Sequence, residues 1–287
     1  MPKSFLISIL ISFFCLFSLL VQAQIQPSFS WQQRGNDIEG ERAGDVAGQA
    51  VDLNHAGNIM VLGATSNDDN GTNSGHARIF QWNGAAWNQL GNDIDGVNNG
   101  DLSGRGLSLD SAGTTVAIGA TNHQNDGHVR IFEWNGVAWV QKGMDIDGLS
   151  NSDDFGISVS LSADGNTVII GDRNNFFGGP GRGAAHVFEW NGASWAQKGG
   201  TIYGEFSGDN CGESVDISYD GNIIVIGARL NDGNGTSSGH IRIYEWDGNN
   251  WSQMGNDIDG ESVGSDAGIS SAISADGHTV ALGGRRN

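Results

Sequence analysis

Hydrophobic and polar residues alternate over short segments of this chain, and polar turn sequences separate the segments. Residues 156–161 (Gly-Ile-Ser-Val-Ser-Leu) place apolar side chains between serines, which predicts a β-strand with one apolar face. Residues 167–171 (Thr-Val-Ile-Ile-Gly) are almost continuously apolar, which predicts a strand buried on both faces. Asp164-Gly165 predicts a tight hairpin between them, because glycine adopts the positive φ that such a turn requires.

The pattern repeats along the chain from one tryptophan to the next. Each of these tryptophans is followed by Gln at +2, Ile at +7 and Gly at +4, +9, +17, +26 and +32. The repeats are residues 31–86, 87–138, 139–194, 195–250 and, in part, 251–287. Within each repeat we expect four short strands and no helix. The first three strands are exemplified by residues 139–142, 156–161 and 167–171. The fourth is exemplified by residues 128–134 of the preceding repeat.

Four strands in each repeat predict an all-β fold, a β-propeller built of four-stranded blades. A four-stranded sheet with apolar faces cannot bury them alone, so it stacks on its neighbours. A β-solenoid is disfavoured because its coils are shorter, and a string of sandwiches because each needs about seven strands. The fifth repeat stops after its third strand, so we expect the chain to be a fragment of a larger ring, with seven blades as one candidate size.

The N-terminal segment has the organisation of a secretory signal peptide. Lys3 precedes an apolar run over residues 5–20, and residues 21–23 (Val-Gln-Ala) suit the positions before a cleavage site. We therefore predict a signal peptide over residues 1–23 and a secreted or cell-surface protein over residues 24–287. A membrane anchor is the alternative, but a run of about 16 apolar residues is short for spanning, so we expect no stable membrane insertion.

Charge and cysteine content exclude several other roles. The chain has 33 acidic against 14 basic residues and a net charge of -19, so we expect no nucleic-acid partner. Cys15 lies in the predicted signal peptide, which leaves Cys211 alone and rules out an internal disulfide after cleavage. We interpret Cys211 as a small buried residue.

A family resemblance follows from residues 153–159 (Asp-Asp-Phe-Gly-Ile-Ser-Val), the Asp164-Gly165 turn and the strand that ends at Ile170-Gly171. Together they resemble the FG-GAP repeat of integrin α-subunit propellers and of many secreted bacterial proteins. The resemblance implies an extracellular module for binding or adhesion. The phenylalanine of Phe-Gly is present only at Phe155, and the calcium-binding loop of the family is here a short hairpin. We therefore interpret Asp164, Asp220 and Asp276 as turn formers.

A different set of acidic residues recurs at +6, +8 and +14 from the tryptophans. Residues two apart on a strand point to the same side, so each +6 and +8 pair presents two carboxylates together, and calcium prefers several such oxygens. The glycine at +9 would let the loop curl around an ion. The alternative is a solvated acidic rim that keeps the protein soluble. The candidate calcium ligands are Asp37, Glu39, Asp45, Asp93, Asp95, Asp101, Asp145, Asp147, Asp153, Asp257 and Asp259.

The fourth repeat lacks the acidic pair, since Thr201 and Tyr203 replace it. The loops over residues 67–71 and 231–235 are rich in Asn, Asp and Gly; they are either flexible connectors or a second place for weak calcium binding. The equivalent loop of the third repeat contains Phe176 and Phe177 instead. Exposed aromatic residues there predict contact with an extracellular protein or polysaccharide, and packing against a neighbouring blade is the alternative.

Catalytic motifs are scarce in the chain. His76, His128 and His240 occupy one repeat position at the start of a strand, which favours a structural role, and a catalytic carboxylate pair should be unique rather than repeated. We therefore predict that the chain is not an enzyme and acts in adhesion or in recognition of an extracellular protein or polysaccharide. Two alternatives stay open: an accessory propeller of a secreted carbohydrate-active enzyme, and a purely structural scaffold.

Overall fold

The computed structural model describes residues 31–149 and 154–286. The chain divides into two units, residues 1–36 and residues 37–287. Of the first unit only residues 31–36 are described, and they contain no strand. The predicted signal peptide and Asp153 lie outside the described residues. Among the residues that are described, no helix is long and apolar enough to cross a membrane.

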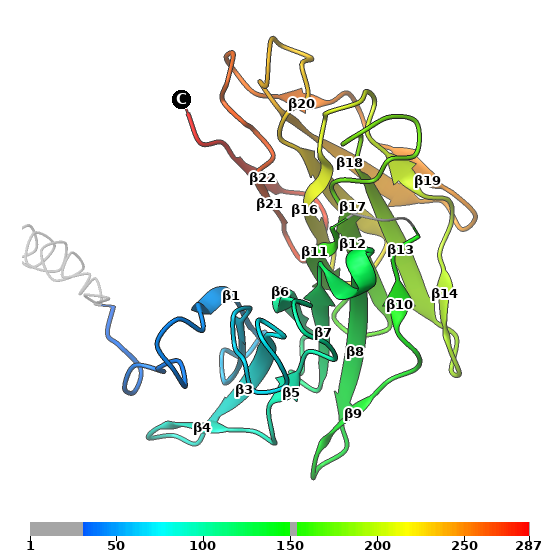
Figure 1. Cartoon of the computed structure of the whole chain (residues 1–287). Helices are drawn as coiled ribbons and strands as arrows, with labels where there is room; N and C mark the ends of the chain where they lie inside the picture. Colours follow the sequence, from blue (N-terminus) through cyan, green and yellow to red (C-terminus); the bar gives the residue numbers. More distant parts are fainter. Residues whose placement is uncertain (1–30, 150–153, 287) are drawn as a thin grey trace, which may run out of the picture. The chain divides into compact units, whose positions relative to one another are not determined.

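Residues 37–287 form four similar antiparallel sheets and a final strand pair (Figure 1). Sheet 1 contains β1 (Ala47–Leu53), β2 (Ile59–Ala64), β3 (His76–Trp82), β4 (Trp87–Gln89) and β5 (Ile94–Asp95). Sheet 2 contains β6 (Ser103–Leu109), β7 (Thr115–Ala120), β8 (His128–Trp134), β9 (Trp139–Gln141) and β10 (Ile146–Asp147). Sheet 3 contains β11 (Phe155–Leu161), β12 (Thr167–Asp172), β13 (Ala184–Trp190), β14 (Trp195–Gln197) and β15 (Ile202–Tyr203).

Sheet 4 continues the same series. It contains β16 (Cys211–Ile217), β17 (Ile223–Ala228), β18 (His240–Trp246), β19 (Trp251–Gln253) and β20 (Ile258–Asp259). The last pair is β21 (Ser270–Ile273) with β22 (Val280–Gly283). A short 3-10 helix, η1 (His123–Asn125), precedes β8.

Each of sheets 1–4 is a propeller blade whose fourth strand is divided into two pieces. In sheet 1 the order is β1-β2-β3-β4, and β5 also pairs with β3. The strands β1, β6, β11, β16 and β21 contact one another in succession, and the short strands lie at the outer edges (Figure 1). The prediction of an all-β propeller with four-stranded blades is confirmed. The tryptophan strand of each repeat completes the sheet of the repeat before it, so sheets and sequence repeats are offset by one strand.

Two of the repeated glycines meet where neighbouring sheets pack. The glycine at +32 lies near the end of the second strand of each sheet, and it contacts the glycine at +17 in the first strand of the next sheet. A Cβ atom on Gly119 would overlap the carbonyl oxygen of Gly156 and lie 2.9 Å from its carbonyl carbon. Because both neighbours are backbone, no side chain fits and the sheets approach closely. The pairs are Gly63 with Gly104, Gly119 with Gly156, Gly171 with Gly212, and Gly227 with Gly268.

The paired tryptophans tie each sheet to the one before it. Trp139 packs on Trp134 with ring centroids 5.4 Å apart, and its Nε1 donates a hydrogen bond of 2.8 Å to the carbonyl oxygen of Leu90 beside sheet 1. Both rings also lie over Gly91, the glycine at +4, where a Cβ would come within 2.9 Å of each. Trp195 and Trp251 donate the same bond to the carbonyl oxygens of Lys142 and Lys198, so the tryptophans pack blade against blade.

The hairpin aspartates have the structural role assigned to them. Asp164 Oδ1 accepts hydrogen bonds from Ser162 Oγ at 2.6 Å and from the Asn166 N–H at 3.0 Å, and Gly165 has φ of 64°. These bonds lower the pKa of the Asp164 carboxyl, although burial opposes them. Asp220 and Asp276 make the equivalent bonds, so the interpretation as turn formers is confirmed.

The second strands form the core, as their apolar sequence predicts. Val168, Ile169 and Ile170 of β12 are fully buried. Tyr244 of β18 is also buried, and it occupies the position that phenylalanine fills in the other sheets, at Phe80, Phe132 and Phe188. Burial raises the pKa of the Tyr244 hydroxyl to about 12.

This pKa shift predicts a loss of stability at alkaline pH. The unfolded chain releases the Tyr244 proton near the ordinary pKa of 10.0, whereas the folded protein keeps it until about 12, so stability is full below the first value and falls between them. One unit above the ordinary pKa the loss should be about 1 kcal/mol. The Tyr244→Phe variant should lose this component and resemble the wild type at neutral pH, because the other sheets accept phenylalanine. Urea unfolding of the wild type and the variant at neutral and alkaline pH measures these stabilities. An equal loss of stability at alkaline pH in the two proteins would contradict the prediction.

Candidate functional site

Three groups of metal-ligating side chains occupy the same position in sheets 1, 2 and 4 among the residues that the structure describes. We call them the histidine–carboxylate groups. In each group, one ligand atom from every residue lies within 4.8 Å of the others, so each could hold a metal ion. The groups are Glu41, Asp69, His76 and Asp93; His128, Asp145 and Asp147; and Glu205, His240 and Asp257.

Antiparallel pairing brings the histidine and the acidic residues together. The histidine is the first residue of the third strand, β3, β8 or β18. The second short outer strand pairs with this same end, so that His128 lies opposite Asp147 in the β8–β10 register. The acidic residue two positions earlier lies in the link between the two outer strands, next to the histidine. The +6 and +8 acids of one repeat therefore reach the histidine of the repeat before.

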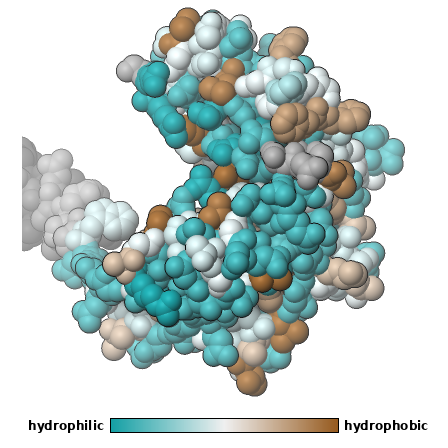
Figure 2. All heavy atoms as spheres, viewed as in Figure 1, coloured by the Kyte–Doolittle hydropathy of each residue, from teal (hydrophilic) through white to brown (hydrophobic). Residues whose placement is uncertain are grey.

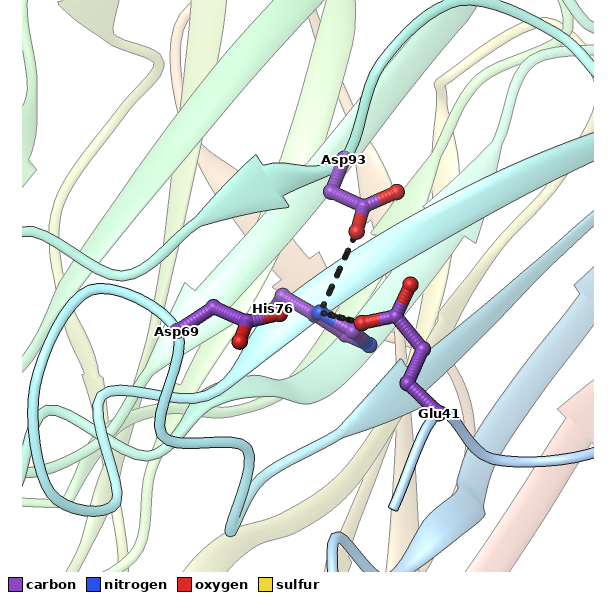
Figure 3. A group of neighbouring side chains, drawn as sticks. All are labelled: Glu41, Asp69, His76 and Asp93. Carbon is purple, nitrogen blue, oxygen red and sulfur yellow. Dashed lines mark ion pairs between the residues drawn. The ribbon is translucent and has the colours of Figure 1, made fainter.

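The first group combines three carboxylates with one imidazole (Figure 3). His76 Nδ1 lies 3.7 Å from Asp93 Oδ2 and 3.9 Å from Glu41 Oε2. Burial, together with the nearby Asp69 and Asp93, raises the pKa of the Glu41 carboxyl. The carboxylates of this group lie close together, and a bound cation would offset their mutual repulsion.

The second and third groups repeat this geometry with tighter contacts. His128 Nδ1 is 3.4 Å from Asp145 Oδ2. His240 Nδ1 is 3.3 Å from Asp257 Oδ2 and 3.8 Å from Asp259 Oδ1. In all three groups the same ring nitrogen faces the carboxylates.

The three histidines are fully buried and lack hydrogen bonds. His76, His128 and His240 are each 0% exposed, and neither ring nitrogen of any of them has a hydrogen-bond partner in the described part of the chain. Burial lowers the pKa of all three imidazoles, and that of His128 falls to about 4. They are therefore neutral at pH 7, which is the form that binds metals.

The glutamine at +2 positions the aspartate at +6. Gln141 Nε2 donates a hydrogen bond of 2.6 Å to Asp145 Oδ1, and Gln253 makes the same bond to Asp257. The other carboxylate oxygen, Oδ2, faces the histidine. The recurring Trp-x-Gln-x-Gly-x-Asp sequence thus orients one carboxylate in each group.

Two of the predicted ligands at +14, Asp45 and Asp101, lie outside the groups and bind their own loops. Asp101 Oδ2 accepts hydrogen bonds from the Val97 and Asn98 N–H groups and lies 3.0 Å from His123 Nδ1. Asp45 Oδ2 likewise accepts from the Arg42 N–H and from Asn67 Nδ2. One oxygen of each carboxylate, Oδ2, therefore binds the loop itself, and calcium binding by Asp45 and Asp101 stays a prediction.

The glycine at +9 also has a different role from the expected one. A Cβ on Gly148 would lie 3.0 Å from Phe155 Cβ and 3.1 Å from the carbonyl carbon of Asp126. The residue is glycine because the backbone at Asp126 and the Cβ of Phe155 pass close to it.

The remaining predicted ligands are distributed unevenly. Asp37 and Glu39 are exposed and lie outside the groups. Asp95 pairs with His76 in register but is not a member of the first group, and burial raises the pKa of its carboxyl. Asp93, Asp145, Asp147 and Asp257 are in the groups, and Asp259 lies at the edge of the third.

Three kinds of residue were not assigned to the metal site by the sequence prediction. The histidines were given a structural role, and Glu41 and Glu205 at +10 were not considered. Asp69 lies in a loop that was interpreted as a flexible connector or as a separate place for weak calcium binding. The Gly-His-x-Arg sequence that recurs before β3, β8 and β18 was the available signal. Local sequence does not show that the histidine segment and the acidic segment are paired strands, and this pairing is what brings the histidine and the acidic residues together.

Sheet 3 carries aromatic residues where the other sheets carry the groups. Ala184 replaces the histidine, and Thr201 and Tyr203 replace the acidic pair. Phe177 stacks on Tyr203 with ring centroids 5.1 Å apart. The guanidinium carbon of Arg182 lies 5.4 Å from the centroid of the Tyr203 ring. On the face shown in Figure 2, hydrophobic residues are scattered among hydrophilic ones. Phe176, Phe177 and Phe206 are 48%, 68% and 69% exposed. We call Phe176, Phe177, Tyr203 and Phe206 the aromatic cluster.

A groove of about 320 Å³ lies where the first strands of the sheets end. Its polar side chains bind the neighbouring strands. Asp52 Oδ2 accepts the Leu109 N–H at 2.7 Å, and Asp216 Oδ2 accepts the Ile273 N–H at 2.8 Å. Ser108 Oγ accepts the Leu161 N–H in the same way. These side chains therefore join adjacent sheets.

Cys211 has no feature of a reactive thiol. It is fully buried, and burial raises the pKa of its thiol, so the thiolate is disfavoured. The interpretation of Cys211 as a small buried residue is confirmed.

Comparison with known proteins supports the fold and gives no family. No family model and no curated protein matches the chain. Among similar solved structures is PpgL, the periplasmic gluconolactonase of Pseudomonas aeruginosa, with a TM-score of 0.52 and 13% identity over 80% of this chain and 63% of that one. A Bacteroides uniformis protein provisionally assigned as a 6-phosphogluconolactonase has a TM-score of 0.48 and 10% identity over 82% of this chain and 77% of that one. The β-propeller domain of the Trilobed protease from Pyrococcus furiosus has a TM-score of 0.42 and 11% identity over 70% of this chain and 55% of that one.

At these identities the likeness shows the β-propeller fold alone. This chain spans less than two thirds of the gluconolactonase. The FG-GAP resemblance has no matching family model behind it.

The prediction that the chain is not an enzyme is corrected by this likeness. A gluconolactonase is among the solved propellers similar to the chain. Function resides in sites rather than in the fold, and catalytic groups can occur without a nucleophile–base pair or a unique carboxylate pair. A scarcity of catalytic motifs therefore does not exclude catalysis.

Proposed function

We propose that the chain is an exported recognition module that binds an extracellular polysaccharide of low charge through the aromatic cluster of sheet 3. The observation that carries this proposal is the stacking of the exposed Phe177 on the half-buried Tyr203, with Phe176 and Phe206 exposed as well. Soluble proteins seldom leave several large aromatic residues exposed in one place unless they contact a ligand. Flat aromatic faces beside polar groups suit a ligand that is apolar on its faces and polar at its edges.

The position of the cluster supports a selected role rather than incidental exposure. Counted from the tryptophan of each repeat, Phe177 and Ala184 stand where the first repeat has Asp69 and His76. Tyr203 stands where the second repeat has Asp95. One blade has thus exchanged a charged site for an aromatic surface at the same place on the fold.

Charge narrows the class of ligand. A net charge of -19 repels polyanions over long range, so acidic polysaccharides are disfavoured. Arg182 places a guanidinium group beside Tyr203, and this group is rich in hydrogen-bond donors. Its Nε donates to the Gly204 carbonyl oxygen. A neutral polysaccharide fits this combination best. The signal-peptide sequence and the FG-GAP resemblance support an extracellular setting, where such binding would serve adhesion.

Removing the two exposed phenylalanines tests the proposal. The Phe176→Ala, Phe177→Ala double variant should bind a neutral polysaccharide at least about tenfold more weakly, because truncating an aromatic contact in an interface costs roughly 1–2 kcal/mol or more. Binding of the mature protein to arrayed neutral, acidic and basic polysaccharides identifies the ligand, and titration with the best of them gives the affinities.

Val137→Ala is the matched control, because Val137 is 82% exposed on an outer hairpin away from the cluster. It should leave the affinity unchanged, and thermal unfolding should show both variants folded. Unaltered affinity in the double variant would reject the cluster as the binding surface. Binding to matrix proteins and to no polysaccharide would reject the ligand class.

A further inference from the structure

We propose that the three histidine–carboxylate groups each bind a divalent transition-metal ion, with Zn²⁺ as the representative ion. The inference is independent of the aromatic cluster, because sheet 3 contains no such group among its described residues. The ion would join the third strand of a blade to the outer strands and the loops around it.

The spacing of the ligand atoms suits a small ion. In a tetrahedral zinc site with bonds of about 2.0–2.1 Å, neighbouring ligand atoms are about 3.3–3.4 Å apart. The distances from the histidine Nδ1 atoms to the facing carboxylate oxygens are 3.3 Å at Asp257, 3.4 Å at Asp145 and 3.7 Å at Asp93. For these pairs an ion would require displacements of only a few tenths of an ångström. The other ligand atoms of each group lie within 4.8 Å and would have to move inward by up to about 1.5 Å.

The buried histidines provide the second, independent observation. A buried polar nitrogen without a partner costs free energy, and native proteins rarely leave one unsatisfied. Here three side chains at the same repeat position are each 0% exposed, and the Nδ1 of each has no hydrogen-bond partner yet faces two or more carboxylate oxygens (Figure 3). A metal ion would satisfy the imidazole nitrogen and the carboxylates together.

The histidine selects a transition metal over calcium. Calcium binds through oxygen atoms and requires six to eight of them, whereas imidazole nitrogen is a preferred ligand of zinc, copper, iron and nickel. The first group offers one nitrogen and three carboxylates, which completes a tetrahedral set. The other two groups offer three ligand residues each, and water would supply the fourth position.

Sheet 3 acts as an internal control for this assignment. Where the histidine is Ala184, the acids are also absent, since Thr201 and Tyr203 stand in their places. Histidine and acidic pair are therefore present together in three blades and missing together in one. A solvated acidic rim gives no reason for the two kinds of residue to vanish together.

Zinc retention by the mature full chain tests the proposal. After metal removal and dialysis against a low concentration of Zn²⁺, we expect about three zinc ions per chain by elemental analysis. Each of Asp93→Asn, Asp145→Asn and Asp257→Asn should lose about one ion, or bind it at least about tenfold more weakly. Asparagine retains an acceptor for the glutamine at +2, so these variants should keep the fold. Asp164→Asn in a hairpin is the control and should retain all the zinc.

A second readout identifies the nitrogen ligand. Co²⁺ in place of Zn²⁺ gives an absorption spectrum that depends on its ligands, and His76→Gln, His128→Gln and His240→Gln should each reduce its intensity by about a third if the sites contribute equally. Circular dichroism checks that the variants are folded. Zinc retained in full by the triple Asp→Asn variant, no zinc retained by the wild type, or displacement of zinc by an equal concentration of calcium would each overturn the proposal. None of these results depends on polysaccharide binding, so the two proposals fail separately.

Discussion

Replacing Gly119 with alanine is expected to lower the free energy of unfolding by about 3 kcal/mol or more, because the new methyl group would overlap the backbone of the neighbouring sheet. Its Cβ would lie 2.9 Å from the carbonyl carbon of Gly156 and closer still to the carbonyl oxygen. Backbone atoms within two packed sheets cannot rotate away as a side chain can. The sheets would have to separate, which would loosen their contact over the whole length of β7 and β11.

Gly200→Ala is the matched control for this substitution. No atom lies within 4 Å of a Cβ at Gly200, and its φ is not in the left-handed region, so the change should alter stability by less than about 0.5 kcal/mol. Urea unfolding followed by tryptophan fluorescence gives both values. Equal stabilities of the two variants would show that the sheets tolerate a wider spacing than their glycine pairs indicate.

Replacing Trp195 with alanine is expected to cost about 3 kcal/mol of unfolding free energy. The ring packs on Trp190 at 5.5 Å and against the core of sheets 2 and 3, and Lys142 Nζ lies 5.6 Å from its centroid. Its Nε1 donates a hydrogen bond of 2.7 Å to the Lys142 carbonyl oxygen on the preceding sheet. The alanine variant loses the packing, the cation contact and the bond between sheets.

Trp195→Phe separates these contributions. Phenylalanine keeps most of the packing and loses the hydrogen bond, so its cost should be about 1 kcal/mol. Chemical unfolding of the two variants measures the difference. If alanine and phenylalanine cost the same, the hydrogen bond rather than the packing would be the dominant contribution, contrary to our expectation.

The sequence predicted the strands well because each carries a local signal. Residues 128–134 and 167–171 match β8 and β12 almost to the residue, and the Asp164-Gly165 turn lies where it was expected. What the sequence could not reveal was the partner of each strand. Repeats anchored on tryptophan place residues 139–141 at the start of a unit, whereas these residues complete the sheet of the unit before. Strand order depends on long-range pairing, which leaves no trace in local alternation.

The same limitation explains the partial success at the metal site. Asp93, Asp145, Asp147 and Asp257 were predicted from their regular spacing, and the structure places them in the groups. Asp45 and Asp101 have the same regular spacing but cap their own loops. Recurrence in a repeat protein marks structural and ligand residues alike, so only the burial and the facing groups of each carboxylate distinguish them.

The offset between sheets and sequence repeats matters for anyone who wishes to recombine these blades. Residues 87–138 form one sequence repeat and look like a natural cassette. A graft with these limits would carry the outer strands β4 and β5 of sheet 1 and would lack the outer strands β9 and β10 of sheet 2. The transferable cassette instead runs from β6 through β10, approximately residues 103–147, and it carries one complete histidine–carboxylate group with it. Shuffling blades at these limits would let metal-type and aromatic-type cassettes be assembled in a chosen order.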